Sequence, residues 1–386
     1  MQATGLITEY NPFHNGHLYH AKVARKLSGC DCVIAVMSGN FTQRGEVALV
    51  DKWSRATMAL QSGAVDLIVE LPPQWSVQSA DYFAKGGVQL LSSLQCSSIV
   101  FGTDVKERVD YETFGRFAVE QEEVINQKVR DFPQKSASFP EKMTSIYQAL
   151  LPEFTLDFSS PNHILAMGYA RENAKLAQPM KLQPIQRVGA SFHDTLVNGK
   201  IASATAIRLA LAESGDISKA VPPATLQLLQ EATMVSWENL FPFLRYKLLS
   251  TSAEELHAIY QMSEGLEYRL KEKIEQAQNF EDFLAKIATK RYTAGRLKRL
   301  LCYCLWNATE EEIRLAQSKT SLHVLGMNEI GQRYLKEKKE SMTLPVISKI
   351  SKREETTKFM VRVDSIFQLA NPKIKEQSRG RFPVKV

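Results

Sequence analysis

The sequence predicts an α/β protein built on a doubly wound parallel sheet, with a helical insertion and a largely helical, basic C-terminal region. Two patterns support this prediction. Short apolar runs alternate with segments of helical spacing through the first 200 residues, and each run ends in glycine, proline or polar residues. Strands separated by helices are typical of parallel sheets, because a crossover between parallel strands is long enough to hold a helix.

The expected elements follow one another along the chain. Apolar runs predict strands over residues 3–8, 32–37, 65–71, 96–101 and 180–185. Helical spacing predicts helices over residues 17–27, 51–62, 80–94, 165–175 and 204–212. The last of these follows Ser203, whose hydroxyl suits an N-cap. Residues 105–150 are polar and helical in pattern, so we expect a helical insertion there.

Three domains are expected. Pro222 and Pro223 mark the end of a sheet domain over residues 1–220. Residues 221–318 have an almost wholly helical pattern. A small basic α/β unit is expected over residues 319–386, because two apolar segments there flank a helical one.

Composition limits the class of protein. The chain has 386 residues, of which 44% are hydrophobic and 23% are charged. No run approaches the ~18 apolar residues of a membrane span, and the N-terminus lacks the parts of a signal peptide. The five cysteines show neither zinc nor C-x-x-C redox spacing. We therefore expect a cytoplasmic protein with reduced thiols, no membrane contact and no metal site built from its own side chains.

Positive charge is concentrated at the C-terminal end. The net charge is +6, and residues 331–386 hold 14 Lys or Arg against 6 Asp or Glu. This surplus fits either a polyanionic partner or a solvated basic surface.

The most informative motif is His14-Asn15-Gly16-His17, between the first expected strand and its helix. Ligands of open α/β sheets bind at the carboxyl ends of strands, and a helix N-terminus favours anions. Gly16 lets the backbone approach a phosphate, and two imidazoles donate to phosphoryl oxygens as charge grows in the transition state. The motif predicts a nucleoside triphosphate site for attack at the α-phosphate. The alternative is two turn histidines that cap a helix.

A second motif begins the helix at 204–212. Ser203 and Thr205 offer hydroxyls beside backbone N–H groups, and Arg208 lies one turn further along. By itself this is also the pattern of a plain capped helix. Together the two motifs resemble the nucleotidylyltransferase superfamily, whose members carry H-x-G-H and an S-x-T-x-x-R type signature. Ala204 stands where that signature often has Ser, which leaves Ser203 and Thr205 to supply the hydroxyl contacts.

Further segments resemble one bacterial family, the tRNA(Met) cytidine acetate ligases. They cover residues 8–17, 37–46, 51–55, 101–104, 160–165 and 186–190. The resemblance spans most of the chain and is specific over its first 210 residues. Thr103-Asp104 departs from the family's usual Glu after an F-G-S turn, and His163 stands where Asn or Asp is common. These departures leave the local shape of the pocket open.

The resemblance implies an ATP-dependent ligase. Acetate would attack the α-phosphate of ATP to give acetyl-adenylate, and the wobble cytidine of elongator tRNA(Met) would take the acetyl group. Mg²⁺ is expected to accompany the triphosphate. The expected ATP site consists of Ile7, Thr8, Glu9, Tyr10, Asn11, Pro12, Phe13, His14, Asn15, Gly16, His17, Leu18, Tyr19, His20, Gly102, Asn162, Arg187, Ser203, Thr205 and Arg208.

The polar loop after the second expected strand is a candidate for the acetate site. We expect Asn40, Arg44 and Asp51 to lie near the reacting centre with His14 and His17 as catalytic residues. The alternative is a loop braced by an Arg–Asp pair.

A basic run with one aromatic residue is the expected tRNA contact. Tyr292 lies within it, and charge beside an aromatic face suits an RNA backbone and an unstacked base. Part of the run is expected to be only solvent-exposed, because its arginines do not share one helical face. The basic residues are Lys290, Arg291, Arg296, Lys298 and Arg299.

Two other functions fit parts of the sequence. The first half alone equally fits a small-molecule nucleotidylyltransferase or carboxylate–amine ligase, against which the basic C-terminal region argues. The third interpretation is a non-enzymatic RNA-binding protein whose catalytic fold has lost its activity. The intact motif residues argue against it.

Overall fold

A computed structural model describes residues 1–104, 109–133, 139–152, 160–186, 199–289, 291–351 and 354–386. Its centre is one sheet with the strand order β5-β4-β1-β2-β3-β6-β7, and β8 pairs with β6. The strands are β1 (Ala3–Thr8), β2 (Cys32–Ser38), β3 (Leu67–Leu71), β4 (Ser98–Thr103), β5 (Lys181–Gln186), β6 (Leu322–Met327), β7 (Val346–Ile347) and β8 (Val384–Lys385). The five N-terminal strands are parallel, as the sequence predicts.

Helices cover both faces of this sheet. One face packs on α1 (Asn15–Ser28), α2 (Lys52–Gln61), α9 (Ala204–Ala212) and α10 (Pro223–Glu231). The other face packs on α4 (Ala80–Ser93), α5 (Tyr111–Glu120), α8 (Pro161–Ala174) and α17 (Glu329–Lys338). Alternate residues of β2 point into the two cores, with Val33 on the first face and Ile34 on the second. The doubly wound arrangement is thereby confirmed.

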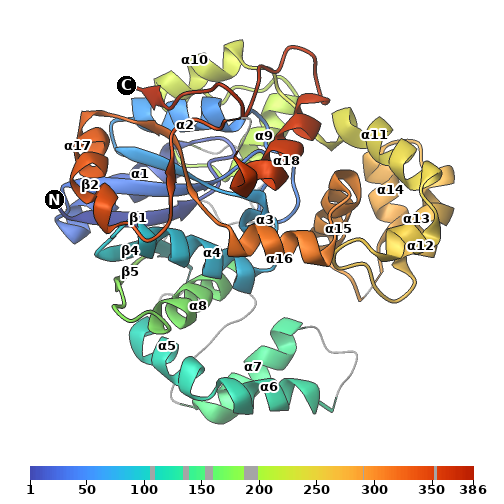
Figure 1. The fold of residues 1–386 in the computed structure, drawn as a ribbon, viewed down its shortest axis with the longest axis horizontal. Coiled ribbons are helices and arrows are strands. Elements are labelled where there is room, and N and C mark those ends of the chain that lie inside the picture. The colour runs from blue at the N-terminus through green and yellow to red at the C-terminus, as the bar shows by residue number, and fades with distance from the viewer. Residues whose placement is uncertain (105–108, 134–138, 153–159, 187–198, 290, 352–353) are drawn as a thin grey trace.

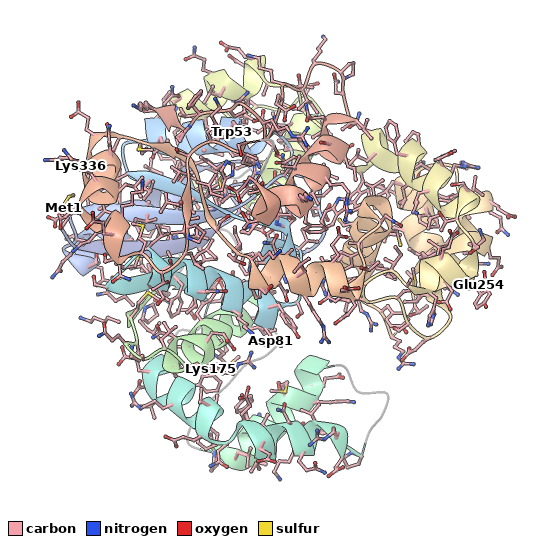
Figure 2. The ribbon with its side chains drawn as sticks, viewed as in Figure 1. Met1, Trp53, Asp81, Lys175, Glu254 and Lys336 are labelled. Carbon is pink, nitrogen blue, oxygen red and sulfur yellow. The ribbon has the colours of Figure 1, made fainter. Side chains whose placement is uncertain are left out.

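The insertion is helical, as expected. It contains α5, α6 (Glu122–Arg130) and α7 (Phe139–Leu150), which extend away from the sheet at the bottom of Figure 1. A salt bridge joins it to the sheet domain, because Lys175 reaches Glu122 of α6 at 2.9 Å. Next to it, Arg171 of α8 pairs with Asp81 of α4 at 3.1 Å within the sheet domain. Asp81 and Lys175 mark this junction in Figure 2.

A block of helices lies beside the sheet, on the right in Figure 1. Its core also takes Phe41 from the loop after β2 and Phe367 from α18. The helices of the block are α11 (Trp237–Ser250), α12 (Ala253–His257), α13 (Leu266–Glu275), α14 (Phe280–Ile287) and α15 (Ala294–Trp306). α16 (Glu310–Ser318) and α18 (Lys358–Gln368) pack on the same core. The short helix α3 (Pro73–Ser76) and two 3₁₀ turns at Lys339–Ser341 and Glu355–Thr357 complete the elements.

Two boundaries differ from the expected domains. Leu229 of α10 packs in the core of the sheet domain, so the helical block begins at α11 and not at residue 221. The C-terminal strand-helix-strand pattern is present as β6, α17 and β7, but it does not form a sheet of its own. β6 pairs antiparallel with β3 and extends the central sheet. The physical reason is that the exposed edge of β3 offers unpaired backbone groups, which β6 satisfies.

The N-terminus confirms this docking. The Met1 amino group lies 2.5 Å from Glu337 of α17, and Met1 and Lys336 are neighbours in Figure 2. Among the described residues, no helix is long and apolar enough to cross a membrane. All five cysteines are buried as free thiols.

Candidate active site

The His-x-Gly-His turn joins β1 to α1 and caps that helix. His14 is the N-cap, and its Nδ1 accepts a hydrogen bond from Gly16 N at 3.0 Å. His17 Nδ1 accepts from His14 N at 3.4 Å, and the two rings stack with centroids 3.7 Å apart. Because both Nδ1 atoms accept, the neutral rings carry their protons on Nε2. The capping alternative and the phosphate-binding prediction are therefore compatible, since the caps fix both donors.

Gly16 is required for this geometry. A Cβ at Gly16 would lie 2.8 Å from His14 Cε1 and 3.0 Å from His14 Nδ1. Any side chain there would push His14 out of its capping position. The glycine thus fixes an imidazole, in addition to the close backbone approach that the sequence predicts.

Arg208 connects the two motifs, which are far apart in the sequence. Its Nη1 donates to the carbonyl of Asn11 at 2.8 Å, across a separation of 197 residues. Its Nη2 donates to Thr205 Oγ1 at 3.2 Å, and Ser203 caps α9 by accepting from Ala206 N at 3.0 Å. Burial lowers the pKa of Arg208, while Glu46 and Glu9 act in the opposite direction. The structure therefore brings both predicted motifs into one site.

Backbone contacts hold the turn in place. Asn15 Nδ2 donates to the carbonyls of Lys200 at 2.9 Å and Lys219 at 2.8 Å, on either side of α9. Asn11 Oδ1 accepts from Leu49 N at 2.8 Å. The remaining expected residues from Ile7 to His20 run from the end of β1 into α1.

Glu9 follows β1 and is the carboxylate of this site. Its Oε1 accepts from Gln43 N at 2.7 Å, which joins the loop after β2 to the end of β1. Burial raises the pKa of Glu9, although this hydrogen bond and the charges of Arg208, Arg44 and Arg55 oppose the rise.

Arg55 is a structural residue of the site that sequence reasoning missed. It is fully buried, and it donates to the carbonyls of Glu9 at 2.6 Å, Ser38 at 3.0 Å and Val50 at 3.1 Å. Burial lowers the pKa of Arg55 to about 10. Its guanidinium holds the carboxyl ends of β1 and β2 together. An arginine inside an otherwise apolar helical pattern was the available signal.

Asn40 and Asp51 have partners within the protein. Asn40 is 2% exposed, and its Nδ2 donates to Asp364 Oδ1 at 2.9 Å and Gln377 Oε1 at 3.2 Å. Its Oδ1 accepts from Lys52 N at 2.8 Å. Asp51 caps α2 through Trp53 N and Ser54 N at 2.9 and 3.0 Å. These contacts make both residues braces of the loop, whereas Arg44 is exposed.

A buried ionic network lies behind this loop, and the sequence did not reveal it. Lys52 Nζ lies 2.8 Å from Glu70 Oε2 and 2.6 Å from Asp364 Oδ2. His323 Nδ1 lies 2.7 Å from the same Glu70 oxygen. Burial by itself would raise the pKa of Glu70, but Lys52 and His323 hold it below its usual value. We call Lys52, Glu70, His323 and Asp364 the buried network.

Two further residues of the expected ATP site, Gly102 and Asn162, lie around the end of β4. Gly102 is in that strand, and Asn162 begins α8 with its Nδ2 2.7 Å from Asp104 Oδ2. Ser160 Oγ donates to the same oxygen at 2.7 Å. His163 is fully buried, with Nδ1 2.9 Å from the Tyr111 hydroxyl. Arg187 lies outside the described residues.

The expected tRNA contact is a set of paired side chains at the start of α15. Tyr292 is buried and bonds to Glu264, so its ring is not an open platform. The Arg296 guanidinium lies 4.3 Å from that ring, while exposed Arg291 lies 2.5 Å from Glu264. Lys298 Nζ lies 2.5 Å from Glu46 of the loop after β2. Lys290 lies outside the described residues.

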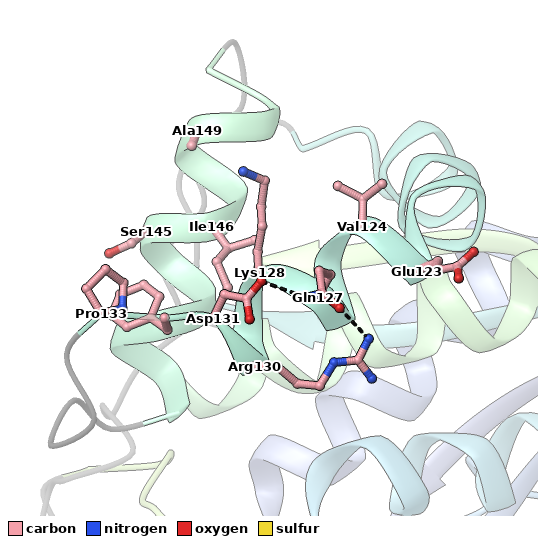
Figure 3. Close-up of a pocket in the computed structure, with 11 residues that line it drawn as sticks. Glu123, Val124, Gln127, Lys128, Arg130, Asp131, Pro133, Ser145, Ile146 and Ala149 are labelled. Carbon is pink, nitrogen blue, oxygen red and sulfur yellow. Dashed lines mark hydrogen bonds between the residues drawn. The ribbon is translucent and has the colours of Figure 1, made fainter.

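A groove in the insertion is separate from these residues. It lies between α6 and α7, with Val124 and Ile146 among its apolar lining (Figure 3). None of its lining residues belongs to the predicted site. Where the chain is described, no three His, Cys, Asp or Glu side chains gather as a metal ion would need.

The fold and the paired motifs define a class, the nucleotidyl transferases. A family model described as HIGH Nucleotidyl Transferase matches residues 1–381, so the chain belongs to that family. Solved structures agree with this class. Apo Thermotoga maritima TmcAL is 29% identical with a TM-score of 0.92, covering 100% of both chains. The form bound with alpha-thio ATP is 28% identical with a TM-score of 0.88, covering 100% of this chain and 99% of that chain.

Curated relatives identify the particular family. A tRNA(Met) cytidine acetate ligase of Lactobacillus delbrueckii subsp. bulgaricus is 40% identical over 395 residues, covering 100% of both chains. The protein of that name from Anoxybacillus flavithermus is 43% identical, covering 90% of this chain and 89% of its own. The one from Streptococcus pneumoniae is 42% identical, covering 100% and 99%. The chain therefore belongs to the tRNA(Met) cytidine acetate ligase family.

Proposed function

We propose that this protein is an ATP-dependent ligase that acetylates the wobble cytidine of elongator tRNA(Met). The hydrogen bond from Arg208 to the Asn11 carbonyl is the main support, because it unites the two anion-binding motifs in one site. The names of the relatives and the alpha-thio ATP bound to a structural neighbour support the substrates. A cytoplasmic location is part of the same proposal.

The first step is the activation of acetate. An acetate oxygen attacks the α-phosphorus of ATP, the bond to the bridging oxygen breaks, and pyrophosphate leaves. His14 and His17 donate hydrogen bonds to the phosphoryl oxygens, and the N-termini of α1 and α9 add backbone N–H groups. Arg44 contributes positive charge at the acetate side, while Asn40 and Asp51 hold the loop that carries it. Mg²⁺ would come with the triphosphate, whose oxygens are its preferred ligands.

The second step is acetyl transfer. The exocyclic amine of cytidine attacks the acetyl carbonyl, AMP leaves with the electron pair of the broken C–O bond, and the amine loses a proton. The product is N4-acetylcytidine. Arg291, Arg296, Lys298 and Arg299 would neutralise tRNA phosphates, with Lys290 beside them in the sequence. Gly102 and Asn162 are proposed to contact the adenosine of ATP, and Arg187 is proposed to pair with phosphate.

Labelled acetate with ATP and Mg²⁺, in the presence and absence of total tRNA, tests the proposal. We expect acetate-dependent pyrophosphate exchange without tRNA, and labelled acetylcytidine in the digested tRNA. Exchange without any labelled nucleoside would indicate a small-molecule ligase. A protein that binds tRNA but shows no exchange and no labelled nucleoside would be a non-enzymatic RNA-binding protein.

A further inference from the structure

The loop after β2 packs directly on α15. A Cβ at Gly45 would lie 2.5 Å from Arg299 N, and Gly45 has a φ of +75°. The Trp237 indole donates to the Gly45 carbonyl at 2.8 Å. Lys298 pairs with Glu46 at 2.5 Å in the same place. This contact fixes the loop of the proposed acetate site on the helix of the proposed tRNA site.

Two arginines approach Gly295 at this contact. A Cβ placed on Gly295 would lie 3.8 Å from both Arg299 Nη1 and Arg44 Cβ. Arg44 is exposed and Arg299 is half-buried. We call Arg44 and Arg299 the arginine pair.

The charge of Arg299 is incompletely compensated by the residues that the structure describes around it. Its Nε is buried and has no hydrogen-bond partner among the residues that the structure describes. Burial is the main cause that lowers the pKa of Arg299, and the like charges of Arg296 and Arg44 lower it further. Within the described ranges, the groups that act on it most strongly include no carboxylate. An anion would relieve both the repulsion and the lost hydration.

The arginine pair adjoins the nucleotide site. Arg44 follows Gln43, whose N–H donates to Glu9 at the end of β1. The charges of Arg44 and Arg208 both lower the pKa of Glu9, and the charge of Glu46 raises the pKa of Arg208. An anion bound here would lie between the His-x-Gly-His turn and the basic start of α15.

We propose that the arginine pair binds a phosphodiester group of the RNA substrate, next to the nucleotide that receives the acetyl group. This inference rests on the proposed function. Guanidinium groups bind phosphate oxygens through paired N–H donors. RNA is favoured over the ATP triphosphate because Arg299 lies on α15, beside Arg296 and Lys298, and not at the N-termini of α1 and α9. Bound RNA phosphate would place the target base beside the activated acetyl group.

The test compares Arg299→Gln with Arg314→Gln, which changes an exposed arginine of α16 that pairs with Glu310 of the same helix at 2.7 Å. We measure tRNA affinity by filter binding over a salt series, acetylcytidine formation, and pyrophosphate exchange without tRNA. Arg299→Gln should weaken tRNA binding about tenfold or more, reduce the salt slope by about 1, and leave exchange at the wild-type rate. Arg314→Gln should match the wild type.

Separate outcomes identify separate failures. If Arg299→Gln reduced pyrophosphate exchange as much as acetyl transfer, the anion would be the triphosphate and the proposal would be wrong. Unchanged tRNA affinity would also overturn it. If the wild type made no acetylcytidine but Arg299→Gln still weakened tRNA binding, the proposed function would be wrong and the RNA contact of the arginine pair would be supported. Should Arg299→Gln unfold, Arg44→Gln, on an exposed side chain, repeats the tRNA-affinity and salt-slope measurements alone, because the proposed function also assigns Arg44 to the acetate side.

Discussion

Two polar clusters lie at the carboxyl end of the same sheet, and they are built in opposite ways. The His-x-Gly-His turn is made from neighbours in the sequence, and its side chains bond to backbone groups of α1. The buried network is made from residues of four distant segments, and its charges bond to one another. His17 is partly exposed, whereas Lys52 is completely buried.

This difference assigns the His-x-Gly-His turn to the candidate active site and the buried network to a structural role. Capping fixes the orientation of both histidine rings at the N-terminus of α1. In the buried network Lys52 is fully occupied by two carboxylates, so it has nothing to offer a ligand. Lys52 instead joins α18 to β3, and Asn40 joins the loop that carries Arg44 to Asp364 and Gln377. A polar residue after a strand is therefore not by itself evidence of catalysis, because other side chains of the protein can occupy it completely.

The largest expected effect comes from breaking the buried network. Lys52→Met leaves Glu70 and Asp364 buried without their cation, which should reduce the free energy of unfolding by about 3–5 kcal/mol. Urea denaturation measures this loss. Arg314→Met, which removes an exposed pair, should leave the urea midpoint unchanged. An equal shift in both variants would contradict the distinction between brace and surface.

The next prediction concerns His17 of the His-x-Gly-His turn. His17→Asn keeps an acceptor for the His14 N–H but removes the ring, and should lower pyrophosphate exchange by about 10²–10³-fold. Its thermal unfolding should stay close to that of the wild type. The control is His257→Asn on α12, whose side chain is 66% exposed. A normal rate for His17→Asn would remove the histidines from the chemistry.

Asn40 is a predicted residue of the reacting centre that also bonds to Asp364 of the buried network. Asn40→Ala leaves Asp364 Oδ1 and Gln377 Oε1 without this donor, so the free energy of unfolding should fall by about 1–3 kcal/mol. Exchange by the folded variant should remain near the wild-type rate. A large loss of exchange at unchanged stability would instead place Asn40 at the reacting centre.

The smallest expected effect is a pH dependence at Glu9. Because burial raises the pKa of Glu9 in the folded state, ionised Glu9 opposes folding, and this penalty disappears as the pH falls toward 4.5, the ordinary value. The wild type should therefore gain stability relative to Glu9→Gln between pH 7 and pH 5. Urea midpoints of the two proteins across this range measure the difference, and a constant offset would argue against the raised pKa.

Local patterns predicted most of the parallel sheet. The runs that became β1 to β4 are mainly apolar, β5 has apolar Leu182 and Ile185 among polar residues, and Ser203 caps α9 as expected. The His-x-Gly-His turn was also readable, because its hydrogen bonds span only two or three residues. The pairing of β6 with β3 was not readable, since nothing near residue 322 records which sheet edge it will meet.

The sequence by itself therefore determined the alternating elements, the capped turn and the family. Tertiary structure alone decided that Asp364 and His323 would meet Lys52 and Glu70, and that Arg299 would lie beside Arg44. The physical reason is the range of the interactions. Caps and periodic apolar faces act within a few residues, whereas ion pairing and helix packing depend on distances in space that the chain order does not contain.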